Sequence, residues 1–255
     1  MILRKIYLKS DIDYITKWRN GMFKKLLLAL GILTSVSMYA VPTLNVYDFE
    51  VKKDKEASYK SVTEDYVNKT MSTEQGILGI FATTDERDKT TSYIVEIYND
   101  YLAFSNHTKN QASKNFKTVI PQIAEGNLNS TEIDVQIAKD KKIEQNDNTF
   151  AVYTVIDVKP ENNKEFTEII KNIAETTFNE EGTLLVYLGT DRRNPSKWCL
   201  FEVYKDIDSY LNHRSAKYFK DYITQTKDMI VDKKRAELQV LKLENKGSLD
   251  YKKLY

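Results

Sequence analysis

Cysteine is nearly absent from the chain, which has only Cys199 among its 255 residues. A single thiol cannot form an intrachain disulfide, and a cysteine-ligated metal site needs more than one thiolate. A surplus of positive charge is also missing, because 38 Lys and Arg stand against 37 Asp and Glu. The sequence therefore excludes a disulfide-stabilised scaffold, and it gives no electrostatic reason to expect nucleic acid as a partner.

Several familiar functional motifs are missing as well. The chain has no glycine-rich phosphate-binding loop, no His-x-x-x-His pair and no Ser-His-Asp pattern. Nucleotide-binding, zinc-dependent and serine-hydrolase functions are set aside on these grounds, and no metal site is expected. The only histidines are His107 and His213, so any catalysis by an imidazole must use one of these two residues.

Residues 22–40 have the features of a secretory signal peptide. Met22 is followed by a basic segment and then by an apolar stretch, and Ala40 supplies the small residue before a cleavage point. We expect residues 1–21 to be an over-extended start and the mature protein to begin near Val41, in the periplasm or outside the cell. The alternative is an uncleaved membrane anchor through residues 26–41, although this stretch is shorter than the roughly 20 apolar residues of a typical span.

The rest of the chain contains an internal repeat. Four pairs of identical residues are separated by the same distance, 106 positions. They are Gly76 and Gly182, Glu96 and Glu202, Tyr98 and Tyr204, and His107 and His213. Such regular spacing indicates a tandem duplication. We therefore expect repeat one over 41–138, a linker over 139–149, repeat two over 150–243 and a loose tail over 244–255.

Both repeats predict the same order of secondary structure. In repeat one, strands are expected over 44–51, 77–83, 91–98 and 133–137, with helices starting near Glu56 and Tyr101 and the second of them interrupted near His107. In repeat two the strands are expected over 150–158, 183–190, 197–204 and 236–243. The order β-α-β-β-α-β is the ferredoxin-like arrangement of the α+β class, with both helices on one face of an antiparallel sheet. The other face must be buried, so the two sheets should pack together and form one barrel, a pseudo-dimer within one chain.

One run of residues resembles a known family. In repeat two, Glu202, Tyr204 and Asp206 are followed by His213, seven residues after the aspartate, and then by Lys217-Tyr218-Phe219-Lys220. This run resembles the antibiotic biosynthesis monooxygenase (ABM) family, of the quinol monooxygenase type, here in two tandem copies over about residues 43–243. The resemblance implies a dimeric α+β barrel and an oxygenase without metal or flavin, which acts on a small aromatic substrate with O₂. The family also contains haem-degrading enzymes, so a haem-binding or haem-degrading protein and a non-catalytic ligand-binding module stay open as alternatives.

The implied chemistry defines the candidate residues. A hydroquinone becomes electron-rich when it loses a proton, and its anion can pass an electron to O₂, so the protein must supply a base, a dry pocket and aromatic walls. A neutral histidine suits the base, because its ordinary pKa is about 6.5. The candidate catalytic residues are His213, Glu202, His107 and Glu96. The candidate substrate-binding residues are Tyr204, Trp198, Tyr98 and Asn45.

Each candidate also has a purely structural interpretation. The histidines could pack at the start of the second helix of each repeat, the glutamates could hold the fold through a hydrogen bond, and the aromatic residues could belong to the core. Asn45 has Ala151 at the same offset in repeat two. Cys199 alternates onto the face opposite Trp198 and is expected to be a buried small apolar residue.

The two repeats are not expected to be equivalent in function. Repeat one has no counterpart of Pro195, the loop proline of repeat two. It also has three more residues between His107 and Phe116 than repeat two has between His213 and Phe219. A small displacement of a catalytic group has a large effect on rate. We therefore expect any activity to reside mainly in repeat two. The sequence leaves further oligomerisation open.

Overall fold

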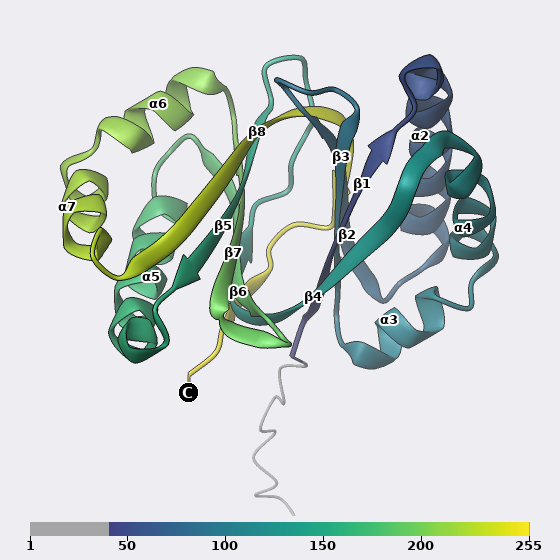
Figure 1. Ribbon diagram of the computed structural model, residues 1–255. Helices are drawn as coiled ribbons and strands as arrows, with labels where there is room; N and C mark the ends of the chain where they lie inside the picture. The colour runs from purple at the N-terminus through teal and green to yellow at the C-terminus, as the bar shows by residue number, and fades with distance from the viewer. Residues whose placement is uncertain (1–40, 255) are drawn as a thin grey trace, which may run out of the picture. The chain divides into compact units, whose positions relative to one another are not determined.

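The computed structural model describes residues 41–254, so the predicted signal peptide and the preceding residues lie outside the described part of the chain. The two repeats have the same element order (Figure 1). Repeat one contains β1 (Thr43–Val51), η1 (Lys53–Lys55), α2 (Glu56–Thr73), β2 (Ile77–Asp85), β3 (Thr91–Tyr98), α3 (Tyr101–His107), α4 (Gln111–Ile123) and β4 (Ala124–Asp140). Repeat two contains β5 (Phe150–Val158), η2 (Pro160–Asn162), α5 (Asn163–Phe178), β6 (Thr183–Asp191), β7 (Asn194–Tyr204), α6 (Ile207–Ser215), α7 (Lys217–Thr226) and β8 (Ile230–Asn245), and is followed by β9 (Asp250–Lys252).

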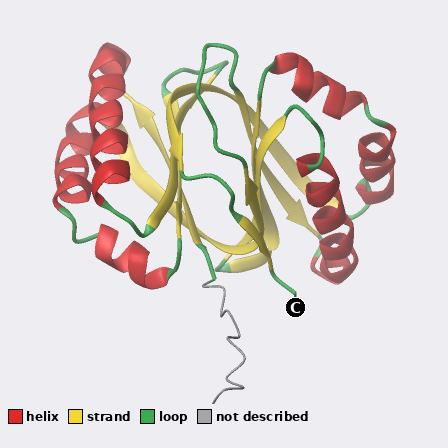
Figure 2. Ribbon diagram, turned by 180° about the vertical axis from the view of Figure 1, so that it is seen from behind, coloured by secondary structure: helices red, strands yellow, loops and turns green. Residues whose placement is uncertain are grey.

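Eight of the strands form a closed antiparallel barrel in the order β1-β3-β2-β8-β5-β7-β6-β4, with β4 pairing back to β1. Helices α2, α3 and α4 cover one side of the barrel and α5, α6 and α7 cover the other, as Figures 1 and 2 show from opposite directions. Each repeat thus contributes one ferredoxin-like sheet with its helices outside. The predicted fold, an intrachain pseudo-dimer, is confirmed.

Two long strands join the repeats. The first part of β4 pairs with β1 of its own repeat, and its last part pairs with β6 of repeat two. In the same way β8 pairs first with β5 and then with β2 of repeat one. Both strands are longer than the sequence predicts, because their first halves are largely solvent-exposed on one side and show no clean apolar alternation. The barrel is therefore closed by strands that belong to both sheets.

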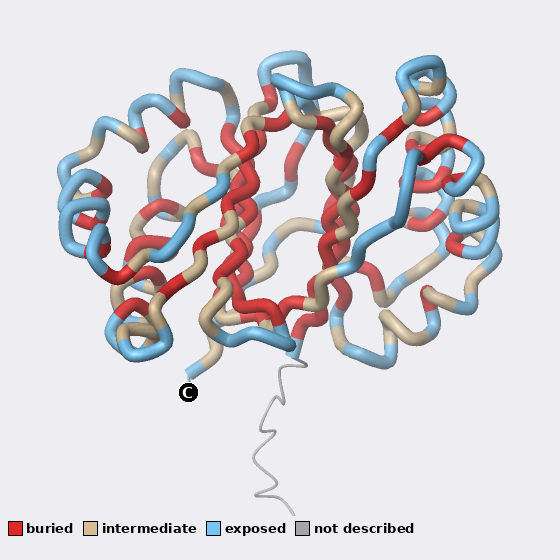
Figure 3. Tube along the Cα trace, in the orientation of Figure 1, coloured by how far each residue is buried: buried red, intermediate tan, exposed pale blue. Residues whose placement is uncertain are grey.

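The strands bury side chains on both faces. Along β3, Val95 and Ile97 point into the barrel, whereas Ile94 and Tyr98 pack against the helices. Figure 3 shows the resulting concentration of buried residues along the barrel strands. Cys199 lies inside the barrel, and burial raises the pKa of its thiol to about 11, which confirms its predicted role as a buried apolar residue.

The end of the chain is more ordered than predicted. Instead of a loose tail after residue 243, β8 continues to Asn245 and β9 pairs with the last part of β4. Lys253 then forms an ion pair with Asp134, at 2.7 Å between Nζ and Oδ2. These contacts are made between residues far apart in the sequence, so no local pattern could indicate them. Within residues 41–254, no helix is both long and apolar enough to cross a membrane.

Candidate functional site

The two histidines are held at equivalent places by helix capping. Asp100 caps α3 by accepting a hydrogen bond from the backbone N–H of Ala103 at 2.7 Å, and Asp206 caps α6 through Ser209 at 2.8 Å. An aspartate at this position satisfies an otherwise unpaired helical N–H group. The helix then places the histidine, seven residues later, against the helix-facing side of the sheet. The recurring Asp-to-His spacing of the sequence is thus the spacing of a cap and the last turn of a short helix.

The two repeated glycines let these helices approach the sheet. A Cβ atom at Gly76 would lie 2.6 Å from Cβ of Ala103, and one at Gly182 would lie 2.2 Å from Oγ of Ser209. Real Cβ atoms are not found so close to other atoms. Gly76 and Gly182 therefore let the helix that carries the histidine lie close to the start of β2 or β6, the strand next to the one that carries the glutamate.

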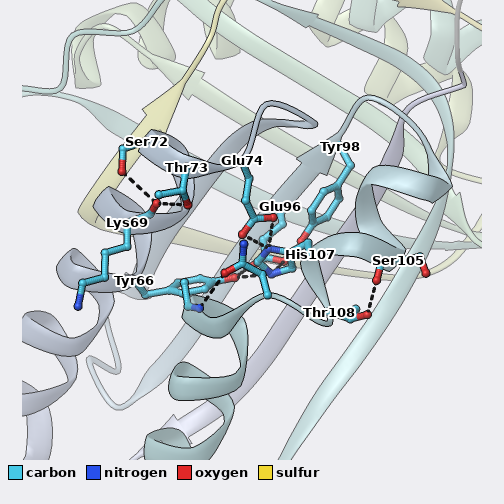
Figure 4. Close-up of polar contacts among 12 residues, drawn as sticks. Tyr66, Lys69, Ser72, Thr73, Glu74, Glu96, Tyr98, Ser105, His107 and Thr108 are labelled. Carbon is cyan, nitrogen blue, oxygen red and sulfur yellow. Dashed lines mark hydrogen bonds and ion pairs between the residues drawn. The ribbon is translucent and has the colours of Figure 1, made fainter.

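In repeat one the polar side chains form a fully connected network around His107 (Figure 4). Nδ1 of His107 lies 3.1 Å from Oε2 of Glu74, and Nε2 lies 2.9 Å from the hydroxyl of Tyr66. The hydroxyls of Tyr66 and Tyr98 both donate hydrogen bonds to the Glu96 carboxylate. Each group of this buried cluster has a partner, as stable buried networks require.

In repeat two the histidine has the same outer partner but a different inner surrounding. Nδ1 of His213 lies 3.1 Å from Glu180 Oε2 and 2.9 Å from the Tyr218 hydroxyl, which itself donates to Glu180. Glu202 accepts one hydrogen bond, from Tyr204 at 3.1 Å. Among residues 41–254, no group forms a hydrogen bond with Nε2 of His213. Since Nδ1–H donates to Glu180, Nε2 is the unprotonated nitrogen and can accept a proton.

A small buried cavity of about 20 Å³ lies beside Glu202 and His213. A space of this size admits about one water molecule. Its walls include the side chains of Ile173, Tyr222 and Lys233. The Tyr222 hydroxyl is buried and lacks a hydrogen-bond partner among the described residues. This cavity therefore combines a carboxylate, an imidazole and unsatisfied polar atoms.

Burial shifts the pKa values of the groups around this cavity. Glu202 is only 6% exposed, and the loss of solvation raises its pKa from 4.5 to about 7. Burial, with a smaller contribution from the nearby charge of Arg214, lowers the pKa of His213 to about 4. Burial also lowers the pKa of Lys233 to about 8. At neutral pH the imidazole is thus neutral, while the carboxyl group exchanges its proton readily.

The four residues that the sequence suggested for substrate binding have different surroundings. Tyr98 and Tyr204 each donate a hydrogen bond to the glutamate of their own repeat. Trp198 does not line the cavity, because it is buried in the helix-side core, where its indole N–H donates to Asn163 at 2.9 Å. Asn45 pairs in register with Glu96, and its buried Nδ2 has no hydrogen-bond partner among the described residues.

The residue of repeat two that is structurally equivalent to Asn45 is not Ala151, which the sequence spacing indicated. Asn45 lies opposite Glu96 on the neighbouring strand, and the residue opposite Glu202 is Val152. Ala151 points into the barrel instead. The spacing between equivalent residues is therefore 107 in the first strand, not the 106 that the motif residues share. Repeat two has an apolar side chain where repeat one has an amide.

Several residues of the site were not among the sequence candidates. Glu74 and Glu180 are separated by the same 106 positions as the motif residues, so the repeat itself could have identified them. Tyr66, Tyr222 and Lys233 lie outside the motif, and no pattern in the sequence singles them out.

The side chains that most often bind metals are scattered over the described structure. Within residues 41–254, no group of three or more His, Cys, Asp or Glu side chains is close enough to hold a metal ion.

Comparison with known proteins identifies the same family in both repeats. The family model "Antibiotic biosynthesis monooxygenase" matches residues 44–119 and 149–225. None of the curated proteins matches the chain significantly. A solved structure of a provisionally assigned monooxygenase from Fusobacterium nucleatum is 91% identical, with a TM-score of 0.84, and covers 85% of this chain and 100% of its own.

Two more distant structures share the fold. A provisionally assigned monooxygenase from Lactobacillus acidophilus is 20% identical, with a TM-score of 0.76, and covers 83% of this chain and 99% of its own. The structure of an anthrone oxidase-like protein is 11% identical, with a TM-score of 0.57, and covers 82% of this chain and 94% of its own. At these identities the likeness concerns the fold alone. With both repeats matched by the family model, the chain belongs to the antibiotic biosynthesis monooxygenase family.

Proposed function

We propose that the protein is a cofactor-independent monooxygenase that acts on a quinol or a related phenolic aromatic, and that repeat two is its working site. The observation that carries this proposal is the buried cavity of repeat two, which Glu202, His213 and Tyr222 line together. The buried Tyr222 hydroxyl lacks a hydrogen-bond partner among residues 41–254, and an unsatisfied buried polar group is costly unless a ligand satisfies it. In repeat one the hydroxyl of Tyr66 donates to the equivalent glutamate, Glu96, and lies 2.9 Å from Nε2 of His107.

In the proposed reaction Glu202 removes the proton of the substrate hydroxyl, because a base with a pKa near the working pH is the most effective. The imidazole of His213 forms the wall beside the hydroxyl, and Glu180 fixes the orientation of its ring. Lys233 lies within electrostatic reach of Glu202 and stabilises the anion that forms. The anion passes one electron to O₂, and the resulting radical and superoxide combine into a C–O bond. The peroxide takes up the proton that Glu202 removed, and the ring carbon loses its own hydrogen as the O–O bond breaks. One oxygen atom stays as a carbonyl, and the other leaves as water.

Oxygen uptake tests this proposal directly. The purified protein is expected to consume one O₂ per molecule of a menadiol-type substrate, measured with an oxygen electrode at neutral pH under conditions that limit spontaneous oxidation. The quinone product should carry one oxygen atom from ¹⁸O₂. Uptake no faster than in the absence of protein would contradict the proposal and would favour a non-catalytic binding module.

We also propose that the protein is exported and that its mature form begins near Val41, because a basic segment and an apolar stretch follow Met22. N-terminal sequencing of the protein from the periplasm or the culture medium is expected to give Val41 or a neighbouring residue. A cytoplasmic product that starts at Met1 would refute export. A membrane-bound product that starts at Met22 would instead indicate an uncleaved anchor.

A further inference from the structure

Helices α2 and α5 occupy the same place in the two repeats, and their buried residues correspond at a spacing of 107 positions. The buried residues of α2 are Tyr59, Thr63, Tyr66, Val67 and Thr70. Those of α5 are Phe166, Ile170, Ile173, Ala174 and Thr177. The agreement of all five positions shows that Tyr66 and Ile173 are structural counterparts. The sheet-facing side of the helix thus carries a phenol in repeat one and an aliphatic side chain in repeat two.

Tyr66 fills the site of repeat one. Its ring is buried and stacks on Phe116, with 4.2 Å between the centroids. Its hydroxyl donates to Glu96 and lies 2.9 Å from Nε2 of His107. A phenol, the chemical group of a quinol, is therefore already bound between the glutamate and the histidine of repeat one.

Ile173 cannot make these contacts, and repeat two contains the cavity in the corresponding place. Ile173 lines this cavity together with Glu202 and His213. In repeat one, Tyr66 contacts the glutamate and Nε2 of the histidine. The equivalent groups of repeat two, the Glu202 carboxylate and Nε2 of His213, are thus left for a group from outside. The volume of about 20 Å³ suits a hydroxyl group but not a whole aromatic ring.

A surface groove gives the ring a place to lie. This groove, of about 410 Å³, runs between α5 and α7, and two of its lining residues, Ile173 and Tyr222, also line the cavity. These two side chains therefore form the wall between the groove and the buried acceptors. A group could pass between the two spaces only if one of these side chains rotated, and side chains change rotamer far more readily than the sheet deforms.

We propose that Tyr66 is a built-in copy of the substrate, which defines how a phenol binds to repeat two. The substrate inserts its hydroxyl past Ile173 and Tyr222, between the Glu202 carboxylate and Nε2 of His213, and keeps its ring toward the groove between α5 and α7. Repeat one takes no substrate because its own tyrosine occupies the site. This inference rests on the proposed function for the identity of the substrate, but the binding geometry can be tested without turnover.

Exchange of the two residues tests the inference, with p-cresol as the probe and calorimetric stoichiometry as the readout. The wild-type protein is expected to bind one p-cresol. Ile173→Tyr should lower this affinity at least about tenfold, the loss expected for one hydrogen bond to a charged group. Tyr66→Ile should raise the stoichiometry from one to two. Ile173→Val, which keeps an aliphatic side chain and leaves the acceptors open, is the matched control and should lose much less affinity than Ile173→Tyr.

Each outcome decides the matter. If the wild-type protein binds no p-cresol, or if Ile173→Tyr binds it as well as Ile173→Val does, the inferred geometry is wrong. If Ile173→Tyr does not fold, as judged by circular dichroism, Ile173→Phe fills the same space and takes its place. If binding follows the expected pattern but no quinol is oxidised, the proposed function fails while the phenol site stands. If Ile173→Tyr oxidises quinol at the wild-type rate, the function stands and the inference fails.

Discussion

Replacement of Glu202 by glutamine is expected to lower the rate of quinol oxidation by at least about 100-fold, because general-base catalysis contributes about 10²–10⁴-fold to a rate. The amide keeps the size of the side chain and can still accept the hydrogen bond from Tyr204, but it cannot take a proton. The measurement is kcat/KM from oxygen uptake. Glu96→Gln is the matched control in repeat one and should retain nearly the wild-type rate, since Tyr66 occupies its site. Equal losses from both substitutions would argue for two working sites.

The pH dependence of the rate distinguishes the glutamate from the histidine as the base. Activity is expected to rise as the pH passes through about 7, where Glu202 loses its proton. His213, with a pKa of about 4, stays neutral throughout this range and cannot produce that rise. Above about pH 8, Lys233 loses its positive charge and activity should fall. A rise centred near pH 4, with none near pH 7, would transfer the role of base to His213.

Stability measurements separate lost chemistry from lost structure in the same variant. The pKa of Glu202 is raised in the fold, so an increase in pH ionises the unfolded chain first and the folded protein loses stability between about pH 4.5 and 7. A shift from 4.5 to about 7 corresponds to about 3 kcal/mol. Glu202→Gln should therefore be more stable than the wild type by up to about 3 kcal/mol at pH 8 and about equally stable at pH 4, as judged by urea unfolding.

Residues 146–245, expressed alone, are expected to form a homodimer or to aggregate rather than to give a soluble monomer. Without repeat one, β6 loses its partner β4 and the end of β8 loses β2. The barrel interior of repeat two also becomes exposed. The side chains that would lose most burial are almost fully buried in the complete barrel: Leu185, Tyr187, Phe201, Val203 and Leu238. At about 1.5–3 kcal/mol each, these amount to on the order of 10 kcal/mol, comparable with the whole stability of a domain.

Sedimentation velocity and size-exclusion chromatography decide this result, with the full barrel, residues 41–255, as the control. A homodimer would reconstruct the eight-stranded barrel from two identical halves. A stable, soluble monomer of residues 146–245 would contradict the argument, because it would show that the sheet face tolerates water.

Much of the fold follows from short-range patterns, whereas the site does so only in part. Alternation in β3 and β7 and the four pairs at a spacing of 106 place Glu96, Glu202 and the two histidines on equivalent elements. The same spacing assigned the wrong counterpart to Asn45. Equivalent residues are 107 positions apart in the first strand and helix of each repeat, and 106 apart only after Thr70 and Thr177. A single-residue difference in a helix-to-strand connection is hidden when only identical residues are compared.

Residues whose role depends on contacts between different helices and strands could not be identified from the sequence. Tyr66 lies on α2, yet its function depends on contact with His107 of α3, 41 positions away. Lys233 lies in a charged run of β8 that is typical of a solvent-facing strand edge, yet it is half-buried and its ammonium group lies over the ring of Tyr222 on α7. The unequal surroundings of the two glutamates, which separate a filled site from an open one, result from such long-range contacts.

β8 follows all the other barrel strands in the sequence, and this sets an order of events during protein synthesis. Gly79 of β2 pairs with Asn245 of β8, so the barrel cannot close until Asn245 has left the ribosome. Until then β2 and β5, the two neighbours of β8, have open edges that invite pairing with other chains. We therefore expect the barrel to close only after β8 has been synthesised. A nascent chain that stalls before Ile230 would be an aggregation-prone species, although most of its secondary structure is already encoded.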